Sequence, residues 1–295
     1  MNILLTGATG LVGNSIYESI NKKHNLISLI RKNNSEFDPE KVLICDLYED
    51  DIDCENYAFD ILIHCAALIP NSINKFSDEK IAEINKIIDK KIIDFCLKKN
   101  IKLIFISSTS VYDMHNNGAA LNENSMINPI LSYSKEKHWA EVSIMNNLKN
   151  YIILRLNSPY GYKQKNNNVL KIFVENAIAG KPLTYYGTGS RTQDFVNVKD
   201  ISNAVDLSMN CHHNSIYNIA SGDSIGMKQL AELVSKCAKI NFASNVDIVQ
   251  SNLEDPQENL RMSIDISKAK NELHWIPTVV LYDAIKEWMI RLKQK

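Results

Sequence analysis

The sequence predicts an α/β fold in which a doubly wound parallel sheet is joined to a smaller, mixed lobe toward the C-terminus. In the first half of the 295 residues, short runs rich in β-branched residues alternate with longer segments of helical periodicity, which is typical of parallel βαβ units. These short runs are almost continuously apolar, so we expect helices on both faces of the sheet. After Gly161 the pattern changes to polar stretches and a glycine-rich turn at 187–189, which indicates a different kind of structure there.

The expected elements follow this alternation along the chain. Helices are predicted at 11–22, 79–98, 132–148 and 169–179. Strands are predicted at 2–6, 26–31, 42–45, 61–65, 103–107, 151–156 and 216–220. Because the last of these strands is expected to return to the first sheet, residues 1–162 and about 195–221 are assigned to the sheet domain, and residues 163–194 and 222–295 to the substrate-binding lobe.

The composition argues against several functional classes. With 33 Lys+Arg against 34 Asp+Glu, the net charge of -1 provides no basic field, so neither nucleic acid nor a membrane surface is an expected partner. Met1 leads directly into the first strand and no apolar run approaches membrane-spanning length, so we expect a cytoplasmic protein. The six cysteines form no Cys-x-x-Cys pair and are expected to be reduced core thiols. The seven histidines lack ligand partners at metal-binding spacing, so they are interpreted as loop or packing residues and no metal is expected.

A glycine-rich loop follows the first predicted strand and precedes the first predicted helix. Gly7 would allow the tight turn, Gly10 would let the backbone approach a ligand closely, and Gly13 would let the helix pack against the strand. The N-terminus of the helix then offers free N–H groups and a partial positive charge to phosphates. This strand-loop-helix context predicts a Rossmann-type dinucleotide site.

The residue at the end of the second strand bears on which dinucleotide binds. An acidic residue there favours NAD by bonding the ribose 2′-hydroxyl. This chain has Arg31 followed by Lys32, and a cationic pair would attract a 2′-phosphate. We therefore favour NADP(H), with NAD(H) left open, since Arg31 could instead be a solvated strand end or stack on adenine.

Tyr133 and Lys137 lie four residues apart in a predicted helix, so their side chains project from one helix face. An ammonium beside a phenol favours the phenolate and is expected to lower the pKa of the tyrosine toward a useful range for acid-base catalysis. Ser108 follows the predicted strand 103–107 and reaches the sheet edge where open α/β sheets bind ligands. Its hydroxyl could bond a substrate oxygen and relay a proton to Tyr133.

The order and spacing of these motifs strongly resemble the extended short-chain dehydrogenase/reductase family, in the branch of nucleotide-sugar epimerases, dehydratases and reductases. The segments that carry the resemblance are 6–13, 46–47, 64–67, Asn85, 107–112, 133–137, 154–161, 187–200 and 265–275.

The resemblance implies roles for further residues. Ser108 would be the active-site hydroxyl, Tyr133 the catalytic acid-base, and Lys137 the residue that holds the ribose and tunes the tyrosine. Asn85 would brace neighbouring strands. The remaining implied cofactor contacts are Leu11 and Val12 at the pyrophosphate, Asp46 and Leu47 beside the adenine, Ala66 and Ala67 on the nicotinamide side, and Ser158 and Tyr160 near the carboxamide.

Departures from the family pattern narrow the expected activity. Dehydratases of this family carry an Asp-Glu pair directly after the active-site hydroxyl, where this chain has Thr109 and Ser110, so a 4,6-dehydratase is not expected. The epimerase-reductases that make GDP-fucose place a cysteine at the position of Ser110, so that activity is also disfavoured.

The expected substrate contacts also depart from the pattern. Ser158 replaces an amide, and Gln193 stands where the family commonly has an arginine that binds the substrate diphosphate. Arg191 or Arg261 could take over that contact, although either could equally be a surface arginine. The expected substrate-binding residues are therefore Ser108, Thr109, Ser158, Arg191 and Arg261.

Three functions are compatible with these residues. The first is NADPH-dependent reduction of a 4-keto (6-deoxy) nucleotide sugar, favoured by Arg31 and by the missing dehydratase acids. The second is an NAD-dependent nucleotide-sugar 4-epimerase, which would use the same catalytic residues. The third is a catalytically silent nucleotide-binding protein, disfavoured because Ser108, Tyr133 and Lys137 are all present. The family resemblance also implies a homodimer, formed through helices such as 79–98 and 132–148.

Overall fold

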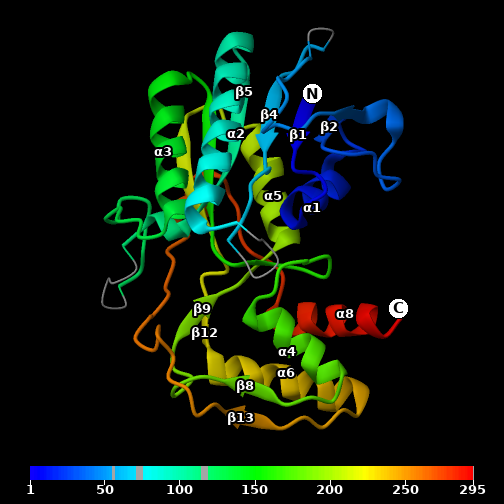
Figure 1. Ribbon diagram of the computed structural model, residues 1–295, viewed down its shortest axis with the longest axis vertical. Coiled ribbons are helices and arrows are strands. Elements are labelled where there is room, and N and C mark those ends of the chain that lie inside the picture. The colour runs from blue at the N-terminus through cyan, green and yellow to red at the C-terminus, as the bar shows by residue number, and fades with distance from the viewer. Residues whose placement is uncertain (55–56, 71–75, 114–118, 295) are drawn as a thin grey trace.

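The computed structural model describes residues 1–54, 57–70, 76–113 and 119–294, and it contains the predicted doubly wound sheet (Figure 1). Seven parallel strands lie in the order β11-β6-β5-β4-β1-β2-β3. Each predicted strand is present, with ends that differ by no more than about one residue. The strands are β1 (Asn2–Thr6), β2 (Asn25–Ile30), β3 (Val42–Ile44), β4 (Ile61–His64), β5 (Lys102–Ser108), β6 (Tyr151–Leu156) and β11 (Ser215–Ile219).

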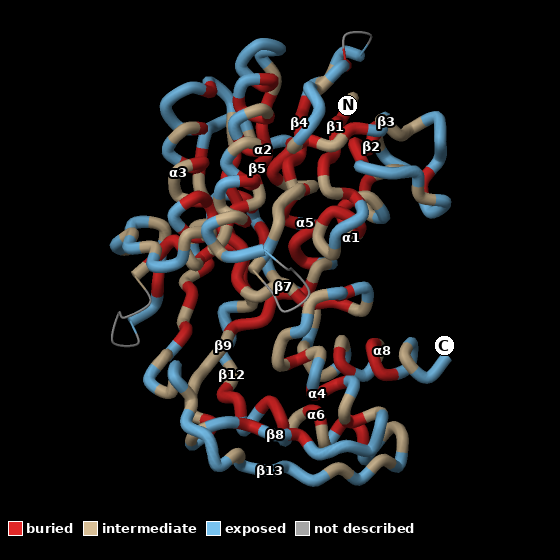
Figure 2. The backbone as a smooth tube through the Cα atoms, in the orientation of Figure 1, coloured by how far each residue is buried: buried red, intermediate tan, exposed pale blue. Residues whose placement is uncertain are grey.

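Helices cover both faces of this sheet. Helices α1 (Leu11–Ile20) and α5 (Val198–Met209) pack together over one face, and α2 (Asp78–Lys99) and α3 (Ser132–Asn147) pack together over the other (Figure 1). Two separate apolar clusters fill these layers, and the sheet strands are buried between them (Figure 2). Burial on both faces explains why the strands read as continuous apolar runs rather than as alternating ones.

Helix α2 shows how local sequence sets the bounds of one of these elements. The Ser77 hydroxyl caps the N-terminus of α2 by accepting a hydrogen bond from the Lys80 N–H. Asp78 and Glu79 lie in the first turn, where carboxylates interact favourably with the helix dipole. The helix ends at Asn100, which adopts a left-handed conformation with φ 52°.

The second lobe contains helices and short strands around its own apolar core (Figure 1). The sequence analysis predicted α4 but none of the other helices of this part of the chain. The helices are α4 (Val169–Ile178), α6 (Met227–Phe242) and α8 (Leu281–Lys293), and the paired strands are β8 (Leu183–Tyr185) with β13 (Ile248–Gln250), and β9 (Thr192–Asp194) with β12 (Ser224–Gly226). Short pairing between β7 (Pro159–Tyr160) and β10 (Val196–Asn197) lies near the junction with the sheet domain.

One segment assigned to the lobe packs instead with the sheet domain. Ile264 forms a bridge with Leu121, and α7 (Ser267–Glu272) lies against β11. Trp275 is fully buried in the same core cluster as the β1 side chains, and its indole N–H donates to the Asp200 carbonyl at 2.9 Å. The apolar side chains of 262–275 therefore pack in the core of the sheet domain. The expected assignment of all of residues 222–295 to the lobe does not describe this segment.

Candidate active site

The glycine loop lies where the strand order of the sheet reverses. Strands β1 and β4 are neighbours there, and their carboxyl ends lead into the loop at Gly7 and into Cys65 and Ala66. Gly7 has a φ of 70°, and a Cβ on it would lie 2.6 Å from the Ala66 nitrogen. A Cβ on Gly13 would lie 2.2 Å from the Gly7 carbonyl oxygen. No side chain fits at these two positions, and a crevice at such a switch point is where α/β sheets bind ligands.

The N-terminus of α1 is suited to an anionic ligand. Its cap residue is Gly10, so no side chain satisfies the first N–H groups, and no acidic residue lies in the first turn. Leu11 and Val12, expected near the pyrophosphate, occupy this first turn and are partly exposed. Unpaired N–H groups and the helix dipole favour phosphate at this place. The loop therefore fits the dinucleotide pyrophosphate that the sequence predicts.

The residues expected around the adenosine lie beside this loop at the ends of β2 and β3. The Arg31 and Lys32 side chains are exposed directly after β2. Asp46 is half-buried and accepts a hydrogen bond from the Tyr48 N–H at 3.0 Å. The Leu47 side chain is buried in the core cluster beneath α2 and α3, and its expected place beside the adenine stays a prediction.

The loop after β4 holds the residues expected near the nicotinamide. Ala66 and Ala67 are partly exposed, and the Ala66 N–H donates to the Thr6 hydroxyl at 3.3 Å. Asn85 of α2 holds Leu68, the residue after Ala67, with two hydrogen bonds. Its amide accepts from the Leu68 N–H at 2.8 Å and donates to the Leu68 carbonyl at 2.9 Å. Asn85 thus braces the loop rather than the strands themselves.

A chain of hydroxyl groups joins β5 to α3 at the same sheet edge. The Ser108 hydroxyl donates to the Ser110 hydroxyl at 2.9 Å, and the Ser134 hydroxyl also donates to Ser110 at 2.9 Å. Ser110 lies in the turn η2 (Thr109–Val111), and Ser134 is the neighbour of Tyr133. Ser108 and Tyr133 are both partly exposed, as residues that meet a substrate must be.

Lys137 lies deeper, in a buried polar network that the sequence analysis did not predict. Its ammonium donates to Asp89 of α2 at 2.9 Å and lies 4.7 Å from the centre of the Phe105 ring. Asp89 also bonds the His64 ring at 2.8 Å, and His64 in turn contacts the Thr6 hydroxyl at 2.6 Å. His64 was interpreted as a packing residue, yet its two ring nitrogens link strand β1 to the carboxylate that faces Lys137.

The pKa of Tyr133 shifts in the direction opposite to the expected one. Lys137 does lower it, as predicted, but burial of the phenol has the larger effect, and Glu136 and Asp89 raise it further. The protein alone therefore keeps Tyr133 protonated at neutral pH, which suits a residue that donates a proton to a developing alkoxide. The expected lowering of the pKa took account of the Lys137 cation but not of the burial of the phenol, nor of the two neighbouring acids.

A second buried network fixes α3 to the sheet. The Arg155 guanidinium donates to both carboxylate oxygens of Glu141, at 2.9 and 2.6 Å, and to the Tyr112 hydroxyl at 2.9 Å. The Ser107 hydroxyl also donates to Glu141 at 2.6 Å. The two-pronged contact between Arg155 and Glu141 sets the position of α3, the helix that carries Tyr133 and Lys137.

Two expected site residues prove to be core residues. Thr109 is 2% exposed and its hydroxyl donates to Asn157 at 2.9 Å, so its expected contact with the substrate stays a prediction. Tyr160 is 1% exposed and packs edge-on against Phe195 in the core of the second lobe. Ser158, in contrast, is partly exposed, has a φ of 39° that non-glycine residues rarely adopt, and accepts a hydrogen bond from the Gln193 amide.

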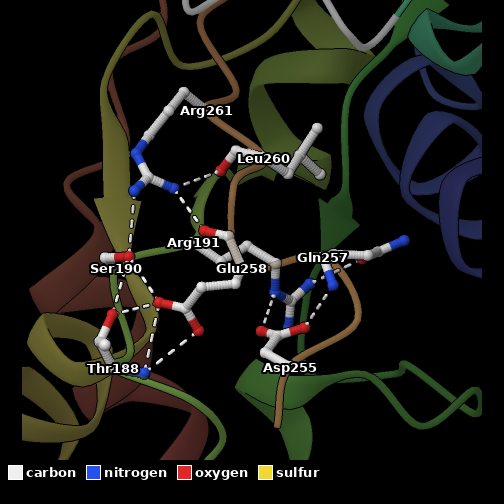
Figure 3. A network of polar contacts seen from close by, with 8 residues as sticks. All are labelled: Thr188, Ser190, Arg191, Asp255, Gln257, Glu258, Leu260 and Arg261. Carbon is white, nitrogen blue, oxygen red and sulfur yellow. Dashed lines mark hydrogen bonds and ion pairs between the residues drawn. The ribbon is translucent and has the colours of Figure 1, made fainter.

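The two candidate phosphate-binding arginines already have partners within the chain (Figure 3). Arg191 donates to Asp255 at 2.8 Å and to Gln257 at 3.2 Å. Arg261 donates to the Glu258 carbonyl at 2.6 Å and to the Ser190 hydroxyl at 3.0 Å. Asp255 forms an ion pair with Arg191, so an anion that binds Arg191 must compete with an internal carboxylate.

Neither a metal centre nor a membrane span is apparent in the described part of the chain. No cluster of three or more His, Cys, Asp or Glu side chains there has the arrangement of a metal site. Among the described helices, none combines the length and the apolar character needed to cross a bilayer. All six cysteines are free thiols, and Cys45, Cys54, Cys96 and Cys237 are buried.

The fold and the glycine loop define a protein of the dinucleotide-binding α/β class, and comparison with known proteins makes this more specific. The profile of the NAD dependent epimerase/dehydratase family matches residues 3–220, so the chain belongs to this family of nucleotide-sugar epimerases, dehydratases and reductases. The sequence-based resemblance to the extended short-chain dehydrogenases/reductases is thereby confirmed.

Relatives and solved structures of several activities resemble the chain. A dTDP-D-glucose 4,6-dehydratase of Dictyostelium discoideum is 27% identical over 270 residues, which cover 79% of this chain but only 61% of that protein. A dTDP-4-dehydro-6-deoxyglucose reductase of Escherichia coli is 29% identical over 237 residues, which cover 72% of each chain. The structure of Thermus thermophilus UDP-glucose 4-epimerase in complex with NAD superposes with a TM-score of 0.84 at 21% identity over 99% of both chains, which shows the fold.

Proposed function

We propose that the chain is an NADPH-dependent reductase that acts on a 4-keto (6-deoxy) nucleotide sugar. The observation that supports this most is the placement of Ser108, Tyr133 and Lys137 at the carboxyl edge of the sheet that also carries the glycine loop. When bound, the nicotinamide would supply the hydride. The residues of the chain would bind the cofactor and substrate and move the proton.

Each residue has a role in this proposal that follows from its surroundings. Tyr133, protonated at neutral pH, would donate its phenolic proton to the carbonyl oxygen as that oxygen gains charge. Ser108 would donate a hydrogen bond to the same oxygen after leaving its present partner Ser110. Lys137 is held as an ammonium by Asp89, so it would bond the ribose hydroxyls and stabilise the phenolate left by proton transfer.

The exclusion of a dehydratase is part of the proposal. Dehydration would need an acid beside Ser108 to protonate the leaving hydroxyl. Thr109 and Ser110 have no carboxyl group, and the Thr109 hydroxyl is buried against Asn157. The similarity to dehydratases is therefore interpreted as shared fold and shared redox chemistry rather than shared elimination.

A 4-epimerase is the second candidate, because the similar epimerase structure holds NAD. It would use the same three residues but retain its cofactor through oxidation and re-reduction of one carbon. The two candidates are separated by incubating purified protein with NADPH or NAD and a panel of keto- and hydroxy-sugar nucleotides. We expect NADPH consumption with a keto-sugar nucleotide only. Tightly retained NAD together with interconversion of two hydroxy-sugar nucleotides would identify the epimerase.

Replacing Tyr133 with Phe tests the catalytic assignment. Removal of one hydroxyl should lower kcat by roughly 100- to 10,000-fold, the usual contribution of general acid catalysis, while leaving the Kd for the cofactor nearly unchanged. Cofactor binding is followed by fluorescence titration and kcat by nicotinamide absorbance. Activity close to that of the wild type would rule out the role given to Tyr133.

Arg31 tests the cofactor preference. Its exposed side chain after β2 is proposed to bond the 2′-phosphate, so Arg31→Asp should shift the ratio of kcat/KM for NADPH and NADH toward NADH by roughly tenfold or more. Lys41→Asp, in the turn η1 (Pro39–Lys41), is a control with the same change of charge. An equal shift in both variants would mean that the effect is only one of net charge.

A further inference from the structure

Two buried carboxyl groups lie behind the Tyr133–Lys137 pair, one from each helix on that face of the sheet. Asp89 of α2 and Glu136 of α3 are 1% and 5% exposed, and Lys137 itself is 1% exposed. The Lys137 ammonium lies 2.9 Å from Asp89 and 3.8 Å from Glu136. If both acids were ionised, two anions would face one cation in a buried space.

His64 does not correct this imbalance. Its ring lies 2.8 Å from Asp89, but burial lowers its pKa more than Asp89 raises it. The imidazole is therefore neutral at neutral pH and acts as a hydrogen-bonding link between Thr6 and Asp89. The excess negative charge must be removed by protonation of one of the two acids.

The contacts of the two acids identify which one carries the proton. Asp89 accepts hydrogen bonds from Lys137 and His64, one on each oxygen. Neither oxygen of Glu136 has a hydrogen-bond donor among the described residues, although both are buried. A buried carboxylate without donors is strongly disfavoured, whereas a protonated carboxyl can donate to a neighbouring carboxylate. These contacts favour Glu136 as the acid that carries the proton.

We propose that Glu136 and Asp89 hold one proton between them at neutral pH, with Glu136 as the protonated acid, and that both act as positioning residues for Lys137. The inference rests on the proposed roles of Tyr133 and Lys137 for its meaning in catalysis. In this arrangement the buried group contains one ammonium, one carboxylate, one neutral acid and one neutral imidazole. Its net charge is zero.

The surrounding electrostatics agree with this assignment. Burial, with a smaller contribution from Asp89, raises the pKa of Glu136 to about 9 against the lowering effects of Lys137 and Lys86. The pKa of Asp89 is held near 2, because Lys137 and His64 outweigh the effect of its burial. Two buried carboxyl groups around a single ammonium do not both ionise, as in other carboxyl dyads.

The proton on Glu136 matters because both acids act on Tyr133. Ionised Glu136 would add a negative charge near the phenol, which raises the pKa of Tyr133, and it would compete with Asp89 for the Lys137 ammonium. Protonated Glu136 leaves Lys137 bonded to Asp89 alone. The pair thus sets both the charge near Tyr133 and the position of Lys137.

Infrared spectroscopy of the apoprotein tests the shared proton without any substrate. A buried protonated carboxyl absorbs apart from ionised carboxylates, so we expect one such band at pH 7 that is lost in Glu136→Gln. The band should also be lost in Asp89→Asn, because Glu136 then ionises to become the counterion of Lys137. Glu83→Gln, at an exposed site of α2, is the control that should leave it unchanged. A band that survives either variant of the pair would overturn the proposal.

A second measurement follows Tyr133 by carbon NMR of ring-labelled tyrosine, with its resonance assigned through the Tyr133→Phe variant. At the high pH where Tyr133 titrates, Glu136 is ionised, so Glu136→Gln should lower the pKa of Tyr133 by about one unit. A purely structural role would leave it unchanged, since Gln has the same shape, and circular dichroism confirms that each variant is folded. If both spectroscopic results hold but no sugar nucleotide is turned over, the proposed function fails while the shared proton stands.

Discussion

Helix α3 takes part in two buried polar networks that differ in how well their charges are matched. Around Glu141, one carboxylate meets one guanidinium, and every carboxylate oxygen has a donor at 2.6 to 2.9 Å. Around Lys137, one ammonium meets two carboxyl groups, and Glu136 lacks any donor among the described residues. The first arrangement holds the helix in place. The second leaves a titratable group beside Tyr133 and Lys137.

Glu136 and Glu141 of α3 show this difference most directly, because the pKa values of these two glutamates on one helix shift in opposite directions. Burial acts to raise both pKa values. Hydrogen bonds from Arg155 and Ser107, together with the nearby His138 ring, reverse the effect at Glu141, and its pKa is lowered. At Glu136 nothing reverses it, and its pKa rises to about 9. Neighbouring donors, rather than depth, determine which carboxyl is charged.

Breaking the matched network should have the largest effect. Arg155→Met leaves the fully buried Glu141 carboxylate without its cation, which typically costs about 3 to 5 kcal/mol in free energy of unfolding. Urea denaturation followed by circular dichroism measures this loss. Arg291→Met removes an exposed pair with Glu287 and should change the stability by no more than about 1 kcal/mol. Equal losses in the two variants would show that the buried fork is not a stabilising feature.

The mismatched network should instead make stability depend on pH. An unfolded glutamate titrates near pH ~4.3, well below Glu136 in the folded protein. Protonated Glu136 therefore contributes stability in full below pH ~4.3, and this contribution is lost as the pH rises toward about 9. Relative to Glu136→Gln, the wild type should lose about 1 kcal/mol for each pH unit between about pH 5.5 and 7.5.

The sign of this slope distinguishes the two glutamates. Glu141 has a lowered pKa, so its contribution to stability is present above about pH 4.3 and is lost as the pH falls through its folded-state value. Urea unfolding of the wild type and of Glu136→Gln at three pH values is sufficient for the comparison. If the two stability curves run parallel, Glu136 is already ionised in the folded protein.

Much of the fold could be predicted from local sequence because the buried strands are continuous apolar runs between glycine loops and polar turns. Helix α5 was not predicted, although Ile201, Val205 and Met209 follow helical spacing. The position of 262–275 could not be predicted, because only tertiary contact shows that Trp275 packs beneath Asp200.

The motif residues of the candidate site could be predicted from the sequence, whereas the buried network behind them could not. Ser108, Tyr133, Lys137 and the glycines follow from spacing. Asp89 was detectable in principle, since it lies on the same helix face as Ile81, Ile88 and Ile92, where a charged residue signals a buried partner. The partners of Asp89 could not be predicted, because they lie far from it in sequence. His64 precedes Asp89 by 25 residues and Lys137 follows it by 48.

A third ion pair, between Arg191 and Asp255, lies in the partly exposed cluster of Figure 3. Breaking this pair should have the smallest effect on stability of the three. Here the side chains are 20% and 7% exposed, so solvent weakens the ion pair, and Asp255→Asn should lower the free energy of unfolding by no more than about 1 kcal/mol. Since the change also frees the Arg191 guanidinium, sugar-nucleotide binding measured by calorimetry should become tighter if Arg191 is the phosphate ligand. Arg191→Met should then weaken binding, whereas unchanged affinity in both variants would place the diphosphate elsewhere.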